Sequence, residues 1–184
     1  MMLIEPITTP RLSLRVLKPE HAGLLHHYLQ ENRQHLGPWE PMRDDRYFEF
    51  AQCEERLHQQ LQQMEAGNGL FLALICDQQM IGNCHFSNIV RGVFQACHLG
   101  YAIAHTHQGK GYMTEALKAA IQHMFEQEKL HRIMANYLPE NVRSAGVLER
   151  LGFEKEGYAK SYLKINGKWR DHVLTALINT AVPE

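Results

Sequence analysis

The residues best suited to chemistry form a glycine-rich turn: Gln108, Gly109, Lys110, Gly111, Tyr112, Met113 and Thr114. An apolar, strand-like segment precedes this turn, and a long amphipathic segment follows it. Glycine lets the main chain approach a ligand closely, because it has no side chain. The first amides of a helix have no partner within the helix, and the helix dipole favours an anion at that end. The turn therefore predicts a binding site for phosphate or diphosphate.

Three known phosphate-binding motifs can be compared with this turn. A P-loop would need a glycine at Ala104 and a serine or threonine at Gly111, and a dinucleotide fingerprint would need a glycine at Thr114. The third motif, Q/R-x-x-G-x-G/A, is typical of the acetyl-CoA-binding turn of the GNAT acetyltransferases. Residues 108–113 match it except that Met113 replaces the final small residue. A glycine-rich connector that binds no ligand is the alternative interpretation.

Hydrophobic periodicity predicts the elements that position the turn. The expected strands are residues 9–17, 70–76, 80–90, 93–103, 132–137, 154–165 and 168–178. The expected helices are one that follows Pro19 and those at 46–66, 111–129 and 141–151. The pair Asn166-Gly167 is a strong hairpin signal. We predict an α/β (α+β) fold, with a central mixed, mostly antiparallel sheet of about seven strands flanked by four helices.

The composition is that of an ordinary globular protein. Of 184 residues, 45% are apolar and 21% are charged, and the formal net charge is −1. We expect a single domain over residues 1–184. The segment Met1–Glu5 has no features of a signal peptide, and no apolar run is long enough to span a membrane. These features predict a soluble cytoplasmic protein without an overall attraction to nucleic acid.

Cysteine and histidine patterns argue against a metal site. The 4 cysteines form no C-x-x-C pair, which favours free thiols in a reducing compartment. The 12 histidines have no metal-binding spacing. We therefore expect no metal ion.

Four segments carry a resemblance that extends along essentially the whole chain. They are residues 32–41, residues 86–92, the glycine-rich turn with Glu115-Ala116, and residues 151–160 followed by 169–172. On these segments the chain resembles the GNAT acetyltransferases and, among them, the RimJ-type ribosomal-protein-alanine N-acetyltransferases. The resemblance implies that the fourth and fifth strands are splayed, with the pantetheine arm of acetyl-CoA in the gap between them.

The resemblance also implies roles for individual residues. Amides from Gly109 to Thr114 would bind the diphosphate. Asn141 would bond the pantetheine arm, and a helix N-cap is its alternative role. Ser144 would donate to the departing thiolate, or it is simply a serine in the first helical turn. Main-chain contacts with the pantetheine arm are implied for Tyr101, Ala102 and Ile103.

The resemblance implies no general base. Positions at which related enzymes move a proton carry residues that cannot do so here: Asn136, Leu148 and Leu163. Trp39 and Glu40 lie in a loop where related enzymes bind substrate, although a tryptophan more often has a packing role. The candidate bases in this sequence are Glu40, Asp171 and Glu115.

The expected reaction is direct attack of a protein α-amine on the thioester. An α-amino group has a pKa of about 7.7–8.0, against about 10.4 for lysine, so a strong base is dispensable. The resemblance points to the N-terminal alanine of a small-subunit ribosomal protein, with association to the ribosome or pre-ribosome. The acids of residues 40–55 either begin a solvated helix or attract a basic tail. Two alternatives stay open: a small-amine acetyltransferase acting on an antibiotic or polyamine, and a ribosome-assembly partner with secondary enzymatic activity.

Overall fold

The computed structural model describes residues 4–181. The expectations for the first residues of Met1–Glu5 and for the ends of the domain at 1–184 lie partly outside the described residues. Eight strands form one sheet in the order β1-β2-β3-β4-β5-β6-β8-β7. The strands are β1 (Ile7–Thr8), β2 (Ser13–Arg15), β3 (Gly69–Cys76), β4 (Gln79–Val90), β5 (Ala96–Ile103), β6 (Arg132–Tyr137), β7 (Glu154–Ile165) and β8 (Lys168–Ile178).

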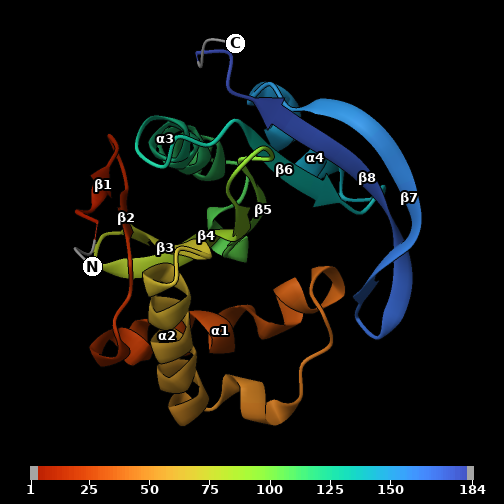
Figure 1. Cartoon of the computed structure of the whole chain (residues 1–184). Helices are drawn as coiled ribbons and strands as arrows, with labels where there is room; N and C mark the ends of the chain where they lie inside the picture. Colours follow the sequence, from red (N-terminus) through yellow and green to blue (C-terminus); the bar gives the residue numbers. More distant parts are fainter. Residues whose placement is uncertain (1–3, 182–184) are drawn as a thin grey trace.

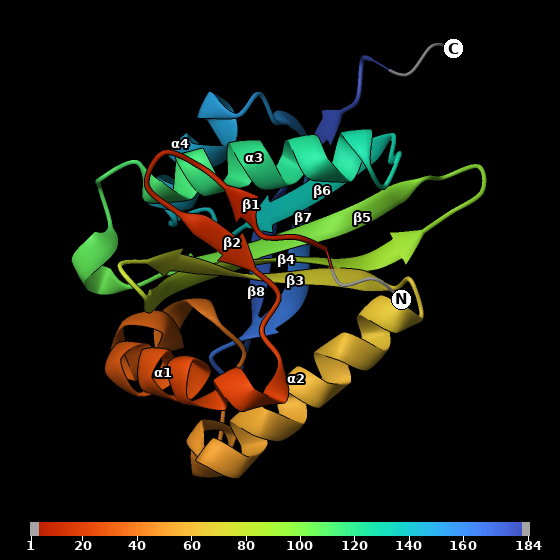
Figure 2. The same ribbon diagram turned by 90° about the vertical axis from the view of Figure 1, so that its left-hand side faces the viewer.

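Four α-helices cover the two faces of this sheet. They are α1 (Ala22–Leu36), α2 (Phe50–Glu65), α3 (Tyr112–Glu126) and α4 (Val142–Arg150). Helices α3 and α4 lie on one face and α1 and α2 on the other (Figures 1 and 2). Each face has its own hydrophobic core. The mixed sheet with helices on both faces confirms the predicted fold class, because each apolar helix stripe is buried against the sheet.

The helix expected at 111–129 has seven apolar residues at helical spacing, and their burial links the sequence pattern to the core. Six of these seven residues are buried and the seventh, Phe125, is half-buried. The buried members are Met113, Ala116, Leu117, Ala120, Ile121 and Met124. This packing fixes α3 against the sheet and therefore fixes the glycine-rich turn at its start.

The strand count is eight rather than seven, because the short strand β1 precedes the expected strand 9–17, of which only Ser13–Arg15 is strand. The Thr9 amide donates to the Leu12 carbonyl at 2.9 Å, and the Leu12 amide donates to Thr9 Oγ1 at 3.0 Å. This turn folds β1 back on β2, so that Ile7 lies opposite Leu14 in an antiparallel pair. Alternation of polar and apolar residues begins within this turn, which is why periodicity placed the start of the strand at residue 9 and missed β1.

Two other expected boundaries are wrong for local reasons. The helix expected at 46–66 is interrupted at Glu49, whose backbone is extended, so that a short 3-10 helix (Asp45–Phe48) precedes α2. Asp44 caps that short helix by accepting the Tyr47 amide at 3.1 Å. The strand expected from Val93 begins only at Ala96, after a loop in which Gly92 has φ +73°.

The sheet opens between its fourth and fifth expected strands, which are β5 and β6 in the structure. These strands are parallel and pair only where Ala96 to His98 lie beside Arg132 to Met134. Beyond His98, β5 continues to Ile103 along β4 alone. The splayed strands predicted by the resemblance are therefore present, and part of the β5 main chain faces the gap.

The described cysteines are all free thiols. Cys84 lies on β4 and Cys97 on β5, and both are fully buried. Burial raises the pKa of each of these two thiols to about 12. They are hydrophobic core residues with little thiolate character.

Candidate active site

A cleft of about 1340 Å³ lies along the gap between β5 and β6. It extends from the glycine-rich turn to the loop that follows α1. Most of the residues predicted from the sequence line this single cleft. They are Trp39, Glu40, Tyr101, Ala102, Ile103, Gln108, Gly109, Gly111, Tyr112, Met113, Thr114, Asn141 and Ser144.

The glycine-rich turn has the geometry of an anion site. Gly109 and Gly111 have φ of +71° and +79°, a left-handed conformation that favours glycine. Gly111 is the N-cap residue of α3 and supplies no side-chain cap. Within residues 4–181, the amides from Gly109 to Thr114 donate to no protein acceptor. A run of free amides at a helix N-terminus fits a diphosphate.

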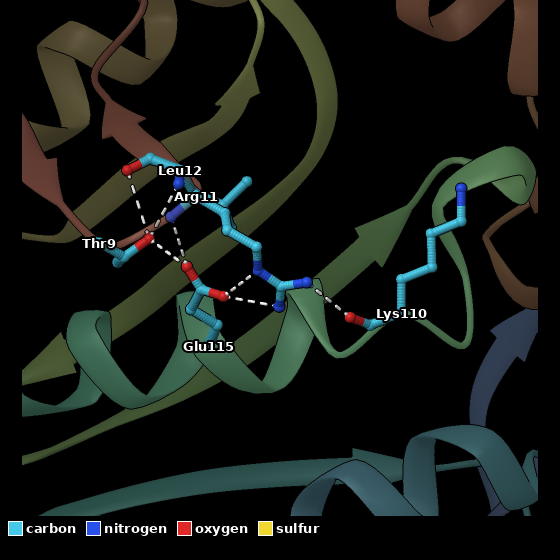
Figure 3. A network of polar contacts seen from close by, with 5 residues as sticks. All are labelled: Thr9, Arg11, Leu12, Lys110 and Glu115. Atoms are coloured by element: carbon cyan, nitrogen blue, oxygen red, sulfur yellow. Dashed lines mark hydrogen bonds and ion pairs between the residues drawn. The ribbon is translucent and has the colours of Figure 1, made fainter.

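A polar network holds the back of this turn (Figure 3). The Glu115 carboxylate accepts from Arg11 Nε at 2.6 Å and from Thr9 Oγ1 at 2.7 Å. Arg11 Nη1 in turn donates to the Lys110 carbonyl at 2.9 Å. Burial raises the pKa of Glu115, but hydrogen bonds from Thr9 and Arg11 outweigh it and lower that pKa overall. Glu115 and Lys110 do not line the cleft, so Glu115 supports the turn rather than serving as a base.

The side chain of Gln108 joins the turn to its surroundings. Its Nε2 lies 3.1 Å from His35 Nε2, and its Oε1 accepts a hydrogen bond from Arg143. His35 is on α1 and Arg143 is on α4, so Gln108 links helices from both faces of the sheet. The first residue of the predicted motif therefore connects the turn to α1 and α4.

Asn141 and Ser144 lie at the start of α4, and both residues line the cleft. Asn141 Oδ1 accepts the Ser144 amide at 3.1 Å, so Asn141 is the N-cap of α4. Ser144 Oγ lies 2.7 Å from the Tyr101 hydroxyl, which reaches across from β5. Burial raises the pKa of Tyr101 to about 12, although the Ser144 hydrogen bond opposes this shift. Both hydroxyl groups belong to residues that line the cleft.

Trp39 ends the 3-10 helix Gly37–Trp39, Glu40 follows it, and both residues line the cleft. Burial raises the pKa of the Glu40 carboxyl, although Arg43 and Arg56 oppose the shift. A carboxylate with a raised pKa is a better proton acceptor at neutral pH. The Glu40 carbonyl also accepts the Asn166 amide at 2.8 Å, so the tip of the β7–β8 hairpin is tied to this loop.

Asp171 lies outside the cleft lining. Its carboxylate accepts the Tyr158 hydroxyl and the Ser161 amide, both at 2.8 Å, within the β7–β8 hairpin. These two hydrogen bonds lower the pKa of Asp171, with the larger effect from the Ser161 amide. The Asp171 carboxylate is therefore engaged within the hairpin, and Asp171 does not line the cleft as a predicted base would.

The acids of residues 40–55 do not form one surface patch. Glu40 lines the cleft, Asp44 caps a short helix, and Asp45 forms an ion pair with Arg33. Glu55 accepts a hydrogen bond from Gln59 at 2.9 Å one turn along α2. These contacts support the interpretation of a solvated helix start over that of a continuous landing surface.

Two residues that line the cleft, Arg56 and His85, were not predicted from any sequence pattern. Arg56 lies among charged residues of α2, where a solvent-exposed side chain is the ordinary expectation, yet it lines the cleft. His85 on β4 lines the same cleft. Burial, with a smaller effect from Arg56, lowers the pKa of His85 to about 4, so its imidazole is neutral at pH 7. Only the tertiary packing of α2 against the sheet brings these side chains together.

No group of three or more His, Cys, Asp or Glu residues within the described range could hold a metal ion. The same part of the chain contains no helix with the length and apolar character needed to cross a bilayer.

Comparison with known proteins identifies relatives of this chain along most of its length. Residues 11–154 match the family model described as an acetyltransferase (GNAT) domain. The ribosomal protein uS5-alanine N-acetyltransferase of Escherichia coli (strain K12) is 49% identical over 173 residues, which cover 93% of this chain and 89% of the relative.

Solved structures show the same similarity. The ribosomal-protein-S5-alanine acetyltransferase from Vibrio fischeri superposes with a TM-score of 0.92 at 39% identity, covering 96% of this chain and 98% of that one. The RimJ protein of Mycobacterium smegmatis, solved in complex with CoA-disulfide, superposes with a TM-score of 0.90 at 30% identity, covering 98% of this chain and 88% of that one.

Proposed function

Because the chain belongs to the GNAT acetyltransferase family, we propose that it transfers the acetyl group of acetyl-CoA to the N-terminal α-amine of a protein. Its proposed substrate is the N-terminal alanine of a small-subunit ribosomal protein, as the names of its relatives suggest. The observation that carries this proposal is one cleft that joins the free amides of the glycine-rich turn to the Glu40 carboxyl.

The residues of the turn fit the cofactor. The amides from Gly109 to Thr114 would hold the diphosphate, and the main chain of Tyr101 to Ile103 would align the pantetheine arm beside β5. When bound, acetyl-CoA supplies the thioester carbonyl. The enzyme then places the amine and the thioester together, which gives the reaction the advantage of an intramolecular step.

The proton route uses a carboxyl group and a hydroxyl pair that line the same cleft. Glu40, with its raised pKa, accepts the proton of the α-ammonium directly or through water. Ser144, paired with Tyr101, donates toward the departing thiolate. We assign no base role to Asp171 or Glu115, because neither lines the cleft. An α-amine has a pKa near neutrality, so the base needs only modest strength.

We also propose that the protein works in the cytoplasm and meets its substrate on or near the ribosome. A ribosome-assembly role with secondary enzymatic activity would predict binding to pre-ribosomes that survives disruption of the glycine-rich turn. Acetylation of a small amine would predict turnover of a polyamine and none of a peptide.

Mass spectrometry tests the proposed function. The protein is incubated with acetyl-CoA and peptides that begin with Ala, Ser or Met, each carrying one internal lysine. We expect acetylation at the α-amine, fastest for the alanine-led peptide. Acetylation confined to the lysine side chain, or to a polyamine supplied in parallel, would refute the α-amine proposal.

A further inference from the structure

The strands β6, β8 and β7 are neighbours in the sheet, and each contributes residues to the lining of the cleft (Figure 1). On the central strand β8, Leu174 is opposite Asn136 of β6, and Arg170 is opposite Leu163 of β7. Alternate side chains of a strand point to the same face, so His172 lies between Arg170 and Leu174 on one face. Their partners Asn136 and Leu163 share that face and line the cleft together with His172.

Of these three residues, only His172 can accept a proton. The side chain of Leu163 has no polar atom, and the Asn136 amide forms hydrogen bonds but stays neutral. Histidine, in contrast, is the side chain that enzymes use most often for proton transfer. The chemistry available to this part of the cleft therefore depends on how the His172 ring is held.

The tautomer of the His172 ring follows from its hydrogen bond. Its Nδ1 atom lies 3.1 Å from the Arg170 carbonyl oxygen. A carbonyl oxygen can only accept, so Nδ1 carries the hydrogen, and in the neutral ring the lone pair is on Nε2. The hydrogen bond thus fixes the ring and leaves Nε2 as a proton acceptor.

The Nε2 atom of His172 is accessible, although the residue as a whole is only 3% exposed. Within residues 4–181, the hydrogen bond from Nδ1 is the one that this side chain forms. The buried side-chain nitrogen and oxygen atoms that lack a partner in that range belong to other residues: Tyr28, Arg56, His98 and His123. Since Nε2 has no partner and is not among these buried atoms, it is open to a molecule that the cleft binds.

The charged side chains next to His172 in the sequence are engaged elsewhere. Arg170 forms an ion pair with Glu140, and the Asp171 carboxylate is held within the β7–β8 hairpin. The ring of Tyr162 packs against the imidazole, with 5.7 Å between the ring centres. These contacts hold the His172 ring in place without occupying Nε2.

We propose that His172 is a catalytic residue whose Nε2 accepts the proton that leaves the amine nitrogen as this nitrogen attacks the thioester. This inference rests on the proposed function, in which Glu40 accepts the earlier proton of the α-ammonium. The new C–N bond replaces the C–S bond, and the electron pair of the C–S bond goes to sulfur. The thiolate then takes a proton from Ser144, which is paired with Tyr101.

Steady-state kinetics of matched variants test this role. His172→Asn keeps an N–H group that can donate to the Arg170 carbonyl but lacks Nε2, and His172→Gln places an amide near Nε2 that forms hydrogen bonds but accepts no proton. His131→Asn is the control, because His131 is exposed and does not line the cleft. With an alanine-led peptide, we expect both His172 variants to lower kcat about 100-fold with little change in KM. His131→Asn should match the wild type.

Other measurements on the same variants separate catalysis from binding and folding. Both His172 variants should keep wild-type affinity for coenzyme A in calorimetry, and His172→Asn should keep the wild-type Tm. Wild-type kcat in His172→Asn would show that Nε2 is not used, and wild-type kcat in His172→Gln would show that it only forms a hydrogen bond; either result would overturn the proposal. A fall in kcat that comes with an equal loss of Tm and coenzyme A affinity would overturn it as well. If the wild type acetylates no α-amine, the proposed function itself fails; if the wild type is active and the variants match it, only this inference fails.

Discussion

The conformation of Gly109 allows a sharp test of the diphosphate site. Gly109 and Gly92 have nearly equal φ, +71° and +73°, and a Cβ added at either position would meet no atom within 4 Å. The left-handed conformation costs a residue with a side chain about 1–2 kcal/mol. The variants Gly109→Val and Gly92→Val should therefore lose similar stability, which corresponds to a decrease in Tm of about 2–8 °C for a chain of this size.

Only one of these two glycines lines the cleft. In Gly109→Val, displacement of the turn should remove at least one hydrogen bond to the diphosphate, and a bond to a charged group contributes about 1.5–3 kcal/mol. The expected loss of coenzyme A affinity is about 10- to 100-fold, measured by isothermal titration calorimetry, with Tm from scanning calorimetry. Gly92→Val should bind as the wild type does. Equal binding by both variants, at equal Tm, would show that the turn does not hold the diphosphate.

Three further predictions concern charged or titrating groups. Glu40→Gln should lower kcat about 10- to 100-fold at pH 7, and pH–rate profiles should lose the fall in kcat/KM that protonation of this carboxyl causes at low pH. Glu115→Gln weakens the contact with Arg11 and should lower the free energy of unfolding by about 1–2 kcal/mol in urea titrations. His85 has a pKa lowered to about 4, so the unfolded state binds its proton first. The free energy of unfolding should therefore fall by up to about 3 kcal/mol from pH 6.5 to pH 4, a fall that His85→Gln should lack.

The parts of the fold that were predicted correctly depend on local chemistry. Asn166 and Gly167 both have positive φ, 45° and 78°, which is the conformation that their hairpin turn requires. Gly152 has φ +85° after α4, as expected for a glycine that ends a helix. The glycine-rich turn is equally local, because each of these signals lies in a few neighbouring residues.

The parts that were not predicted depend on contacts between distant residues. The Arg11–Glu115 pair joins positions 104 residues apart, and nothing near either residue indicates the other. The position of Arg56 depends on how α2 packs over the sheet, and helical periodicity does not distinguish a cleft-facing arginine from a solvated one. Asp171 was a reasonable candidate by residue type, but its hairpin directs it to Tyr158 and Ser161.

The buried thiols also limit the chemical routes open to the protein. Among the described residues that line the cleft there is no cysteine, and Cys84 and Cys97 remain protonated far above neutral pH. Thioester exchange requires an accessible thiolate. No cysteine in the described lining of the cleft can therefore carry the acetyl group as a thioester. For the same reason, a mixed disulfide between the protein and the released coenzyme A is disfavoured in the cleft. With no thiol in the described lining of the cleft, the proposed direct attack of the amine predicts sequential rather than ping-pong kinetics.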